Sequence, residues 1–106
     1  MPKYLLKVNY NANGVKGVMK EGGSGRREAA TQLIESLGGK LESFYFAWGD
    51  VDVYAVADMP DAAAAAAAAL AVSAGGGATC STVVLIEAEE IDQAAQKSTD
   101  YRPPGA

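Results

Sequence analysis

The chain has 106 residues, of which 49% are apolar, and a formal net charge of −4. This length suits a single compact domain, and the acidic balance argues against general binding to nucleic acids. With no histidine and a single cysteine, Cys80, the sequence excludes Ser-His and Cys-His nucleophile pairs, an internal disulfide framework and most zinc sites, so we expect neither a metal nor a cofactor.

The N-terminal part predicts one strand and two helical segments. Residues 3–10 alternate along the chain as a first strand should. Residues 11–14 predict a turn, and the spacing of apolar residues over 15–19 predicts a short helix, which a glycine pair follows. Ser24 is the predicted N-cap of the next helix, which runs to about residue 37 with one apolar stripe.

The most informative stretch predicts two strands, over residues 40–48 and 51–58, joined by a tight hairpin at Gly49-Asp50. Glycine in the first position of a two-residue link is typical of a type II′ turn. Alternation along the strands places large apolar side chains on both faces. Phe44, Phe46 and Trp48 point one way, and Leu41, Tyr45 and Ala47 point the other.

The C-terminal part predicts a helix, a strand and a further helix. Pro60-Asp61 begins the second long helix, which contains eight consecutive alanines, Ala62 to Ala69. Alanine is the best helix former, and its small side chain lets a helix lie close to a sheet. Residues 78–87 predict a fourth strand, in which we expect Cys80 to be a small buried hydrophobe. Glu89 to Lys97 predict a third helix, whose acidic start and basic end match the helix dipole.

The element order is β-α-β-β-α-β with an extra C-terminal helix, which is the ferredoxin-like arrangement of an α+β protein. We expect residues 1–97 to form this single domain and residues 98–106 to form an extended tail. Two helices cover one face of the sheet, and the other face still offers large apolar groups, which is unusual for a monomer. We therefore expect two copies to pack their sheets face to face as a dimeric α/β barrel. The expectation fails if the molecule is solitary, with Phe44, Phe46 and Trp48 either in solvent or beneath the protein's own helices and no neighbouring copy.

Charge is distributed unevenly along the chain. Residues 1–30 carry a net charge of +4, and residues 31–106 carry −8. Such halves can attract one another across an interface between copies, or they can steer an anionic ligand towards the N-terminal part. The alternative is a solvated surface with no such role.

The segment over residues 37–76 resembles the GYD domain family of small bacterial proteins. The resemblance lies in its Leu-Gly-Gly start, its hairpin and the Pro-Asp start of an alanine-rich helix. It extends to the glycine-rich segment before residue 37 and to the YRPPG sequence of the tail. The chain departs from the family's Gly-x-Tyr-Asp motif at one position, because Gly49 and Asp52 are present and Val51 stands in place of the tyrosine. The resemblance implies a dimeric α/β barrel and no established activity.

Two groups of residues are candidates for ligand binding. The glycine-rich basic segment from Lys20 to Arg27 runs into a predicted helix N-terminus, which favours an anion, and its arginines can clamp phosphate or carboxylate. Aromatic and polar side chains along the strands can line a small-molecule pocket. The plainer alternatives are a solvated glycine loop and ordinary core packing. The candidates are Lys20, Ser24, Arg26 and Arg27 in the first group, and Lys7, Asn9, Tyr45, Trp48, Asp52 and Tyr54 in the second.

No residue cluster specifies a reaction, so three functions stay open. A non-catalytic homo-oligomeric module that binds a small anionic or aromatic molecule is narrowly favoured. A cofactor-free oxygenase or isomerase needs a base in the cavity, for which Asp52 and Lys7 are the best candidates. A purely structural assembly protein is the third. Because Met1-Pro2-Lys3 leads directly into a strand and the alanine run is too short to span a bilayer, we expect a cytoplasmic location and no membrane partner.

Overall fold

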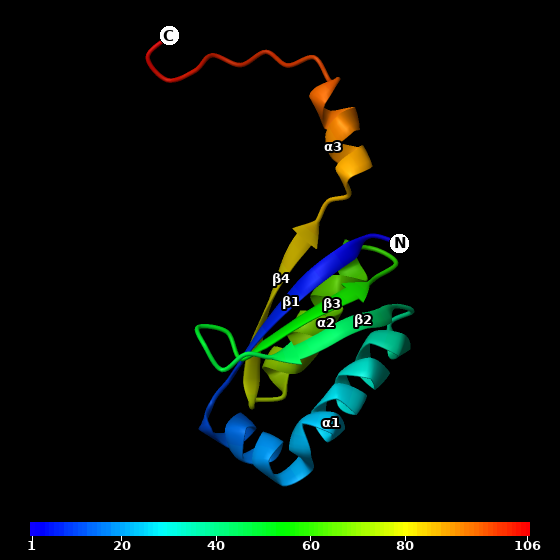
Figure 1. Ribbon diagram of the computed structural model, residues 1–106, viewed down its shortest axis with the longest axis vertical. Helices are drawn as coiled ribbons and strands as arrows, with labels where there is room; N and C mark the ends of the chain where they lie inside the picture. The colour runs from blue at the N-terminus through cyan, green and yellow to red at the C-terminus, as the bar shows by residue number, and fades with distance from the viewer.

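The four strands form one antiparallel sheet in the order β2-β3-β1-β4, as seen in the computed structural model, which describes all residues from 1 to 106 (Figure 1). This order, with helices after the first and third strands, is compatible with the predicted ferredoxin-like fold. The elements are β1 (Lys3–Tyr10), α1 (Ala12–Ser36), β2 (Lys40–Phe46), β3 (Val53–Asp58), α2 (Ala62–Ala74), β4 (Ala78–Leu85) and α3 (Ala88–Ala95).

Helix α1 begins earlier than predicted and is broken by a glycine. Asn11 caps it, because the Asn11 side chain accepts a hydrogen bond of 3.0 Å from the Gly14 backbone N–H. The predicted turn over 11–14 is therefore wrong. Within α1, Gly22 has φ 81° and ψ 163°, which interrupts the helix with a kink. The predicted break between two helical segments is therefore confirmed at Gly22, and only the prediction that Ser24 caps the second segment is wrong, because Ser24 lies within the helix.

The link between β2 and β3 is longer than a two-residue hairpin. The strands end at Phe46 and restart at Val53, so the predicted strand ends at 48 and 51 are wrong. Trp48 has the positive φ of 53° in this loop, whereas Gly49 is not among the residues with positive φ. The predicted type II′ turn, which requires a positive φ at Gly49, is therefore also wrong.

The large aromatic side chains of β2 lie on the helix-covered face of the sheet. Phe44 is paired with Ala55 and Phe46 with Val53, and directly opposed residues share a face. Ala55 and Val53 are buried beneath the helices, and the Phe46 ring lies against Gly23 of α1. Phe44 and Phe46 are therefore covered by the protein's own helix, and the expectation that they need a second copy is wrong.

A β-bulge and a stacking contact also determine how the side chains of β2 and of the loop after it lie. The bulge between Leu41 and Ser43 inserts Glu42 as an extra residue and places Leu41 on the same face as Phe44, opposite to the predicted face. Trp48 stacks on Phe46 with ring centroids 5.8 Å apart and remains 52% exposed. The face of each side chain in β2 thus depends on an irregularity that strict alternation does not include.

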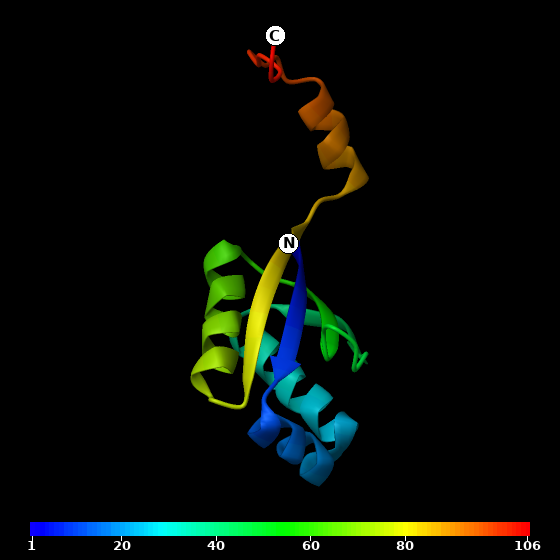
Figure 2. The ribbon, with the colours of Figure 1, turned by 90° about the vertical axis from the view of Figure 1, so that its left-hand side faces the viewer.

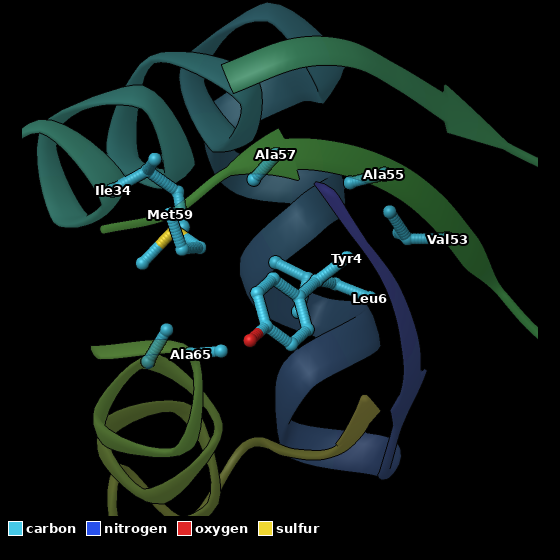
Figure 3. Close-up of a cluster of buried hydrophobic side chains, with 9 residues drawn as sticks. Tyr4, Leu6, Ile34, Val53, Ala55, Ala57, Met59 and Ala65 are labelled. Carbon is cyan, nitrogen blue, oxygen red and sulfur yellow. The ribbon is translucent and has the colours of Figure 1, made fainter. Parts of the chain in front are cut away.

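The core is a small cluster between the sheet and the two helices (Figure 3). Ile34 of α1, Met59 and Val53 are its largest fully buried side chains. Only 10 of the 106 residues are buried, so a single copy leaves much apolar surface in water. The cluster consists of Tyr4, Leu6, Ile34, Val53, Ala55, Ala57, Met59, Ala65 and Ala68.

The face of the sheet opposite the helices, here named the open face, is covered by no other element. Strand register places Leu5 beside Val56 and Val83, and it places Tyr54 beside Tyr45. Tyr45 is 70% exposed and Val83 is 42% exposed. The open face is therefore apolar and aromatic in its middle, although Phe44 and Phe46 are not among its residues.

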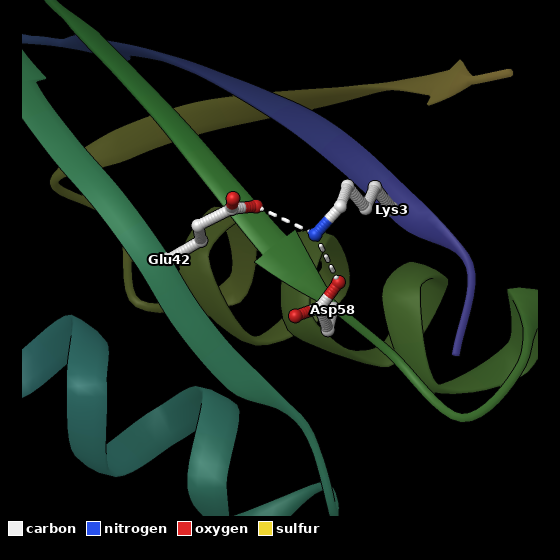
Figure 4. A network of polar contacts seen from close by, with 3 residues as sticks. All are labelled: Lys3, Glu42 and Asp58. Atoms are coloured by element: carbon white, nitrogen blue, oxygen red, sulfur yellow. Dashed lines mark hydrogen bonds and ion pairs between the residues drawn. The ribbon is translucent and has the colours of Figure 1, made fainter. Parts of the chain in front are cut away.

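An ion triad ties three strands together on the open face near the end of β3 (Figure 4). The Lys3 ammonium donates a hydrogen bond of 2.8 Å to Asp58 and another of 2.8 Å to the bulge residue Glu42. These contacts raise the pKa of Lys3 and lower the pKa of Asp58, in each case mainly through the Lys3–Asp58 hydrogen bond. The triad uses the extra residue of the bulge to join β1 and β2 across β3.

Helix α3 stands away from the rest of the molecule (Figures 1 and 2). It has no buried residue, and residues 86–106 extend the molecule to 56 Å. The radius of gyration is 16.9 Å, whereas a compact domain of this length has about 13 Å. The segment from Ile86 to Ala106, here named the C-terminal arm, therefore contributes nothing to the core of its own chain.

Candidate functional site

A cavity of about 440 Å³ lies between the helix-covered face of the sheet, α1 and α2. It forms because α1 packs mainly on β2 and α2 packs mainly on β4, so the two helices hardly touch each other. Its volume lies in the range of typical small-molecule sites, about 300–1,000 Å³. A small molecule would therefore fit in this cavity by its size.

Small side chains keep this cavity open. Alanines of both helices and of β3 line it, and a methyl group added at Gly17 of α1 would meet no atom within 4 Å. The alanine run brings α2 close to β4, as predicted, but its short side chains also leave the space towards α1 unfilled. The apolar lining includes Leu6, Val8, Leu33, Ile34, Leu41, Phe44, Ala29, Ala30, Ala55, Ala68, Ala71, Val72 and Ala78.

The polar part of the cavity wall is formed by Arg26, Glu21 and Tyr10. The Arg26 guanidinium donates a hydrogen bond of 3.2 Å to the Glu21 carboxylate, across the kink at Gly22. Burial acts to lower the pKa of Arg26, but the hydrogen bond to Glu21 and the neighbouring Tyr10 hydroxyl outweigh it and raise the pKa. Arg26 is therefore a permanent cation in a mostly apolar cavity, and it has donors beyond the one bonded to Glu21.

Cys80 of β4 also lines the cavity. It is half-buried, and burial raises the pKa of its thiol. A thiol is nucleophilic only as a thiolate, so Cys80 remains protonated and unreactive at neutral pH. It serves as a small apolar wall residue, close to the buried hydrophobe that the sequence predicted.

The candidate binding residues that the sequence indicated lie in different parts of the molecule. Of the glycine-rich group, only Arg26 lines the cavity, whereas Lys20, Ser24 and Arg27 are exposed on α1. Lys7, Tyr54 and Tyr45 form a row across the open face, because strand pairing sets them side by side, and Asn9 follows Lys7 on that face. Trp48 lies in the loop between β2 and β3, beyond the cavity lining.

Asp52 has a structural position at the end of the same loop. Its carboxylate accepts a hydrogen bond of 2.9 Å from the Tyr10 backbone N–H, and its own backbone N–H donates to the Val8 carbonyl at 3.0 Å. It therefore joins the loop to the last residues of β1. Asp50 is exposed nearby, and no cluster of three or more His, Cys, Asp or Glu side chains that could hold a metal is present in the molecule.

The sequence did not predict that Tyr10 and Glu21 lie beside Arg26 in one cavity wall. Tyr10 occupies the last position of a strand face whose other members are core residues, and it packs against Trp48 with ring centroids 6.0 Å apart. Glu21 precedes Arg26 by five residues with a glycine kink between them, which hides their contact from helical periodicity. The only feature of the sequence that indicates this contact is a carboxylate and an arginine on either side of a glycine-rich segment.

Comparison with known proteins agrees with the fold. The family model of the GYD domain matches residues 4–95, which covers all three helices and every strand except Lys3, the first residue of β1. The search of curated proteins found no match, and the search of solved structures found none either. None of the helices combines the length and apolar character needed to cross a membrane. Because the family model covers most of the 106 residues, the chain belongs to the GYD domain family.

Proposed function

We propose that this protein is a non-catalytic homodimeric module that binds a small apolar molecule with one anionic group. The cavity between the sheet and the helices takes the apolar part, and Arg26 takes the anion. The observation that carries this proposal is the position of Arg26, a permanent cation in the wall of a cavity lined mainly by alanine, valine and leucine.

The chemistry of the cavity defines the ligand. Each methylene group that leaves water for an apolar cavity contributes about 0.8 kcal/mol. Hydrogen bonds to a charged group contribute about 1.5–3 kcal/mol. A carboxylate that binds the Arg26 donors not bonded to Glu21 therefore gains selectivity over an uncharged analogue, while the alkyl or aryl part supplies most of the affinity. Alkyl and aryl monocarboxylates combine these two properties.

A non-catalytic role is supported by the positions of the two candidate bases, which do not line the cavity. The bases considered for a cofactor-free oxygenase or isomerase were Asp52 and Lys7. Asp52 is engaged with the Tyr10 backbone, and Lys7 is on the open face. The ionisable side chains of the cavity wall are Glu21, Arg26, Tyr10 and Cys80, of which Glu21 and Arg26 neutralise each other. This arrangement favours holding a ligand over proton transfer.

The test is a chain-length series of linear monocarboxylates, from butanoate to dodecanoate, measured by calorimetry and by thermal shift. We expect affinity to rise about fourfold per methylene until the cavity is full, since 0.8 kcal/mol corresponds to that factor. The matching alcohols should bind about tenfold or more weakly, because they lack the charge-assisted bond to Arg26.

Two variants make the test specific to the cavity. Arg26→Gln should abolish the preference for the carboxylate over the alcohol and leave alcohol binding intact. Gly17→Leu should weaken both ligands, because the new side chain extends into open cavity space. The absence of binding throughout the series, or full binding by Gly17→Leu, would contradict the proposal.

The homodimer in the proposal rests on the open face. Leu5, Val56 and Val83 form a continuous apolar row across three strands, with Tyr45 and Tyr54 beside it. A small core and an uncovered apolar sheet favour the face-to-face pairing of a dimeric α/β barrel. A two-fold axis through the open face would bury the same patch on both copies.

Replacing Val56 by lysine should prevent this pairing, because a charge would be placed in the middle of the buried patch. We expect the wild-type protein to be a dimer in light scattering at micromolar concentration and Val56→Lys to be a monomer. Glu28→Lys, on the exposed surface of α1, is the matched control and should remain a dimer. A monomeric wild type would overturn the dimer. The proposal for the cavity would not be affected, because the carboxylate series tests it separately.

A further inference from the structure

Helix α3 has an apolar stripe that contacts nothing in its own chain. Ala88, Ile91 and Ala95 fall on one side of the helix by their spacing. Ile91 is 53% exposed, and Ile86, just before the helix, is 58% exposed. Four carboxylates surround the stripe, at Glu87, Glu89, Glu90 and Asp92. Residues 86–96 contain no basic residue. The helix therefore presents an acidic surface with an apolar centre.

This helix is specified by the sequence although it packs on nothing. Glu87 and Glu90 form a capping box, in which the Glu87 backbone N–H donates a hydrogen bond of 3.2 Å to the Glu90 side chain. The match to the GYD family model extends to Ala95, the last residue of α3. Isolated helices this short are marginal in water. A defined α3 thus requires a surface to pack on.

The first part of α1 offers a complementary surface. Residues 12–20 contain Lys16 and Lys20 and no acidic residue. Between these lysines, Met19 is 80% exposed. Lys16 lies three residues before Met19 and four before Lys20, so the three side chains share one side of the helix. This surface, here named the basic patch, has the opposite charge to α3 and a similar apolar centre.

The two surfaces cannot meet within one chain. The start of β4 lies beside the start of α1, because the Asn11 backbone N–H donates a hydrogen bond of 3.0 Å to the Gly77 carbonyl. The end of β4 leads to α3, and eight residues of strand separate the two ends by about 27 Å. Figures 1 and 2 show α3 and the start of α1 at opposite ends of the molecule.

A second copy of the chain resolves this separation. When two sheets pair about a two-fold axis that is perpendicular to the strands, the strands of the two copies run in opposite directions. The α3 end of each copy then lies next to the α1 end of the other. A two-fold arrangement forms the contact twice, once from each arm.

We infer that α3 of each copy docks on the basic patch of its partner, with Ile91 against Met19 and the carboxylates of α3 facing Lys16 and Lys20. This inference rests on the proposed self-association and adds a role for the arm. Because Gly14, Gly17 and Glu21 of the same part of α1 line the cavity, the docked arm would also hold the cavity wall in place.

The test is disulfide formation between different chains. In a Cys80→Ser background, one chain carries Met19→Cys and the other carries Ile91→Cys. The two are mixed under mild oxidation, and the dimer band is identified by mass spectrometry. We expect the mixed disulfide to form at least tenfold faster than in the control mixture of Glu28→Cys with Ile91→Cys. Addition of Lys16→Glu and Lys20→Glu to the first chain should slow it, and Glu89→Lys with Glu90→Lys on the second chain should restore it.

The outcomes separate the docking from the dimer itself. Equal rates in the Met19→Cys and Glu28→Cys mixtures would overturn the docking, as would charge reversal without effect on the rate. If light scattering shows a dimer in that case, the open-face pairing stands and only the role of the arm fails. Binding in the carboxylate series is measured independently and reports on the cavity alone.

Discussion

Asp52 shows how a residue that resembles a catalytic base can have a structural role. Its carboxylate accepts from the Tyr10 backbone N–H at 2.9 Å, and this contact joins the loop after β2 to the end of β1. The position of Tyr10 at the cavity wall therefore depends partly on Asp52, although Asp52 is not among the residues that line the cavity.

Replacing Asp52 by alanine should lower the free energy of unfolding by about 1–3 kcal/mol, because the part-buried Tyr10 N–H loses its acceptor. Asp52→Asn keeps an acceptor oxygen and should cost less. Urea denaturation of the two variants measures the difference. Equal stability of Asp52→Ala and the wild type would show that water replaces the carboxylate.

The Lys3 triad makes stability depend on pH at both extremes. The folded-state pKa of Asp58 is lowered from its ordinary value of 3.8, so its contribution is present above pH 3.8 and is lost as the pH falls below that value. The folded-state pKa of Lys3 is raised above 10.5, so its contribution is present below pH 10.5 and is lost as the pH rises further. At neutral pH both contributions are present.

Lys3→Met removes the partner of Asp58 and keeps an unbranched apolar side chain. We expect the wild type to lose more stability than Lys3→Met between pH 4 and pH 2, because only the wild type must protonate a carboxylate that is bonded to an ammonium. Thermal unfolding at a series of pH values measures this. Parallel pH curves for the two proteins would count against the triad.

At the scale of elements, the kink in α1 places Arg26 next to Glu21. The backbone of Gly22, at φ 81° and ψ 163°, lies in a region that is available almost only to glycine. Without this break the two parts of α1 would form one straight helix, in which residues five positions apart point in different directions. The ion pair in the cavity wall is thus a product of one backbone conformation.

Gly22→Ala should destabilise the protein by about 1–3 kcal/mol, because alanine cannot adopt this conformation without strain. Gly17→Ala is the matched control in the same helix. Gly17 has helical geometry and open space beyond its Cα, so alanine there should stabilise by about 0.4–1 kcal/mol. Denaturation curves of the two variants should shift in opposite directions, and a shared direction would refute the role of the kink.

Helix propensity predicted α2 from its alanine run, and periodicity predicted the order of the other strands and helices, because the apolar patterns of β1 and α1 are regular. It did not predict which face of β2 the helices cover. Alternation sorts Phe44 and Tyr45 onto two faces, but only pairing with Ala55 and Tyr54 shows which of these is buried. The bulge at Glu42 then moves Leu41 to the opposite face from the predicted one. Such irregularities have no signature in local composition.

For the whole molecule, the sequence indicated surplus apolar surface correctly and placed it on the wrong residues. Phe44 and Phe46 are covered by α1, while Leu5, Val56 and Val83 are left on the open face. The cavity could not be predicted, because it arises from the separation of α1 and α2, and that distance is set by tertiary packing. Arg26 was found from charge and glycine spacing alone, without knowledge of its surroundings.

The small side chains of α2 limit the size of the cavity without contributing any polar group to it. Ala68, Ala71 and Val72 line the cavity from a helix that packs mainly on β4. A larger residue at any of these positions would shorten the longest guest that fits, while Arg26 on the opposite helix would be unchanged. In the proposed binding mode, guest size and recognition of the charged group are therefore encoded in separate helices, so that each can diverge among relatives independently of the other.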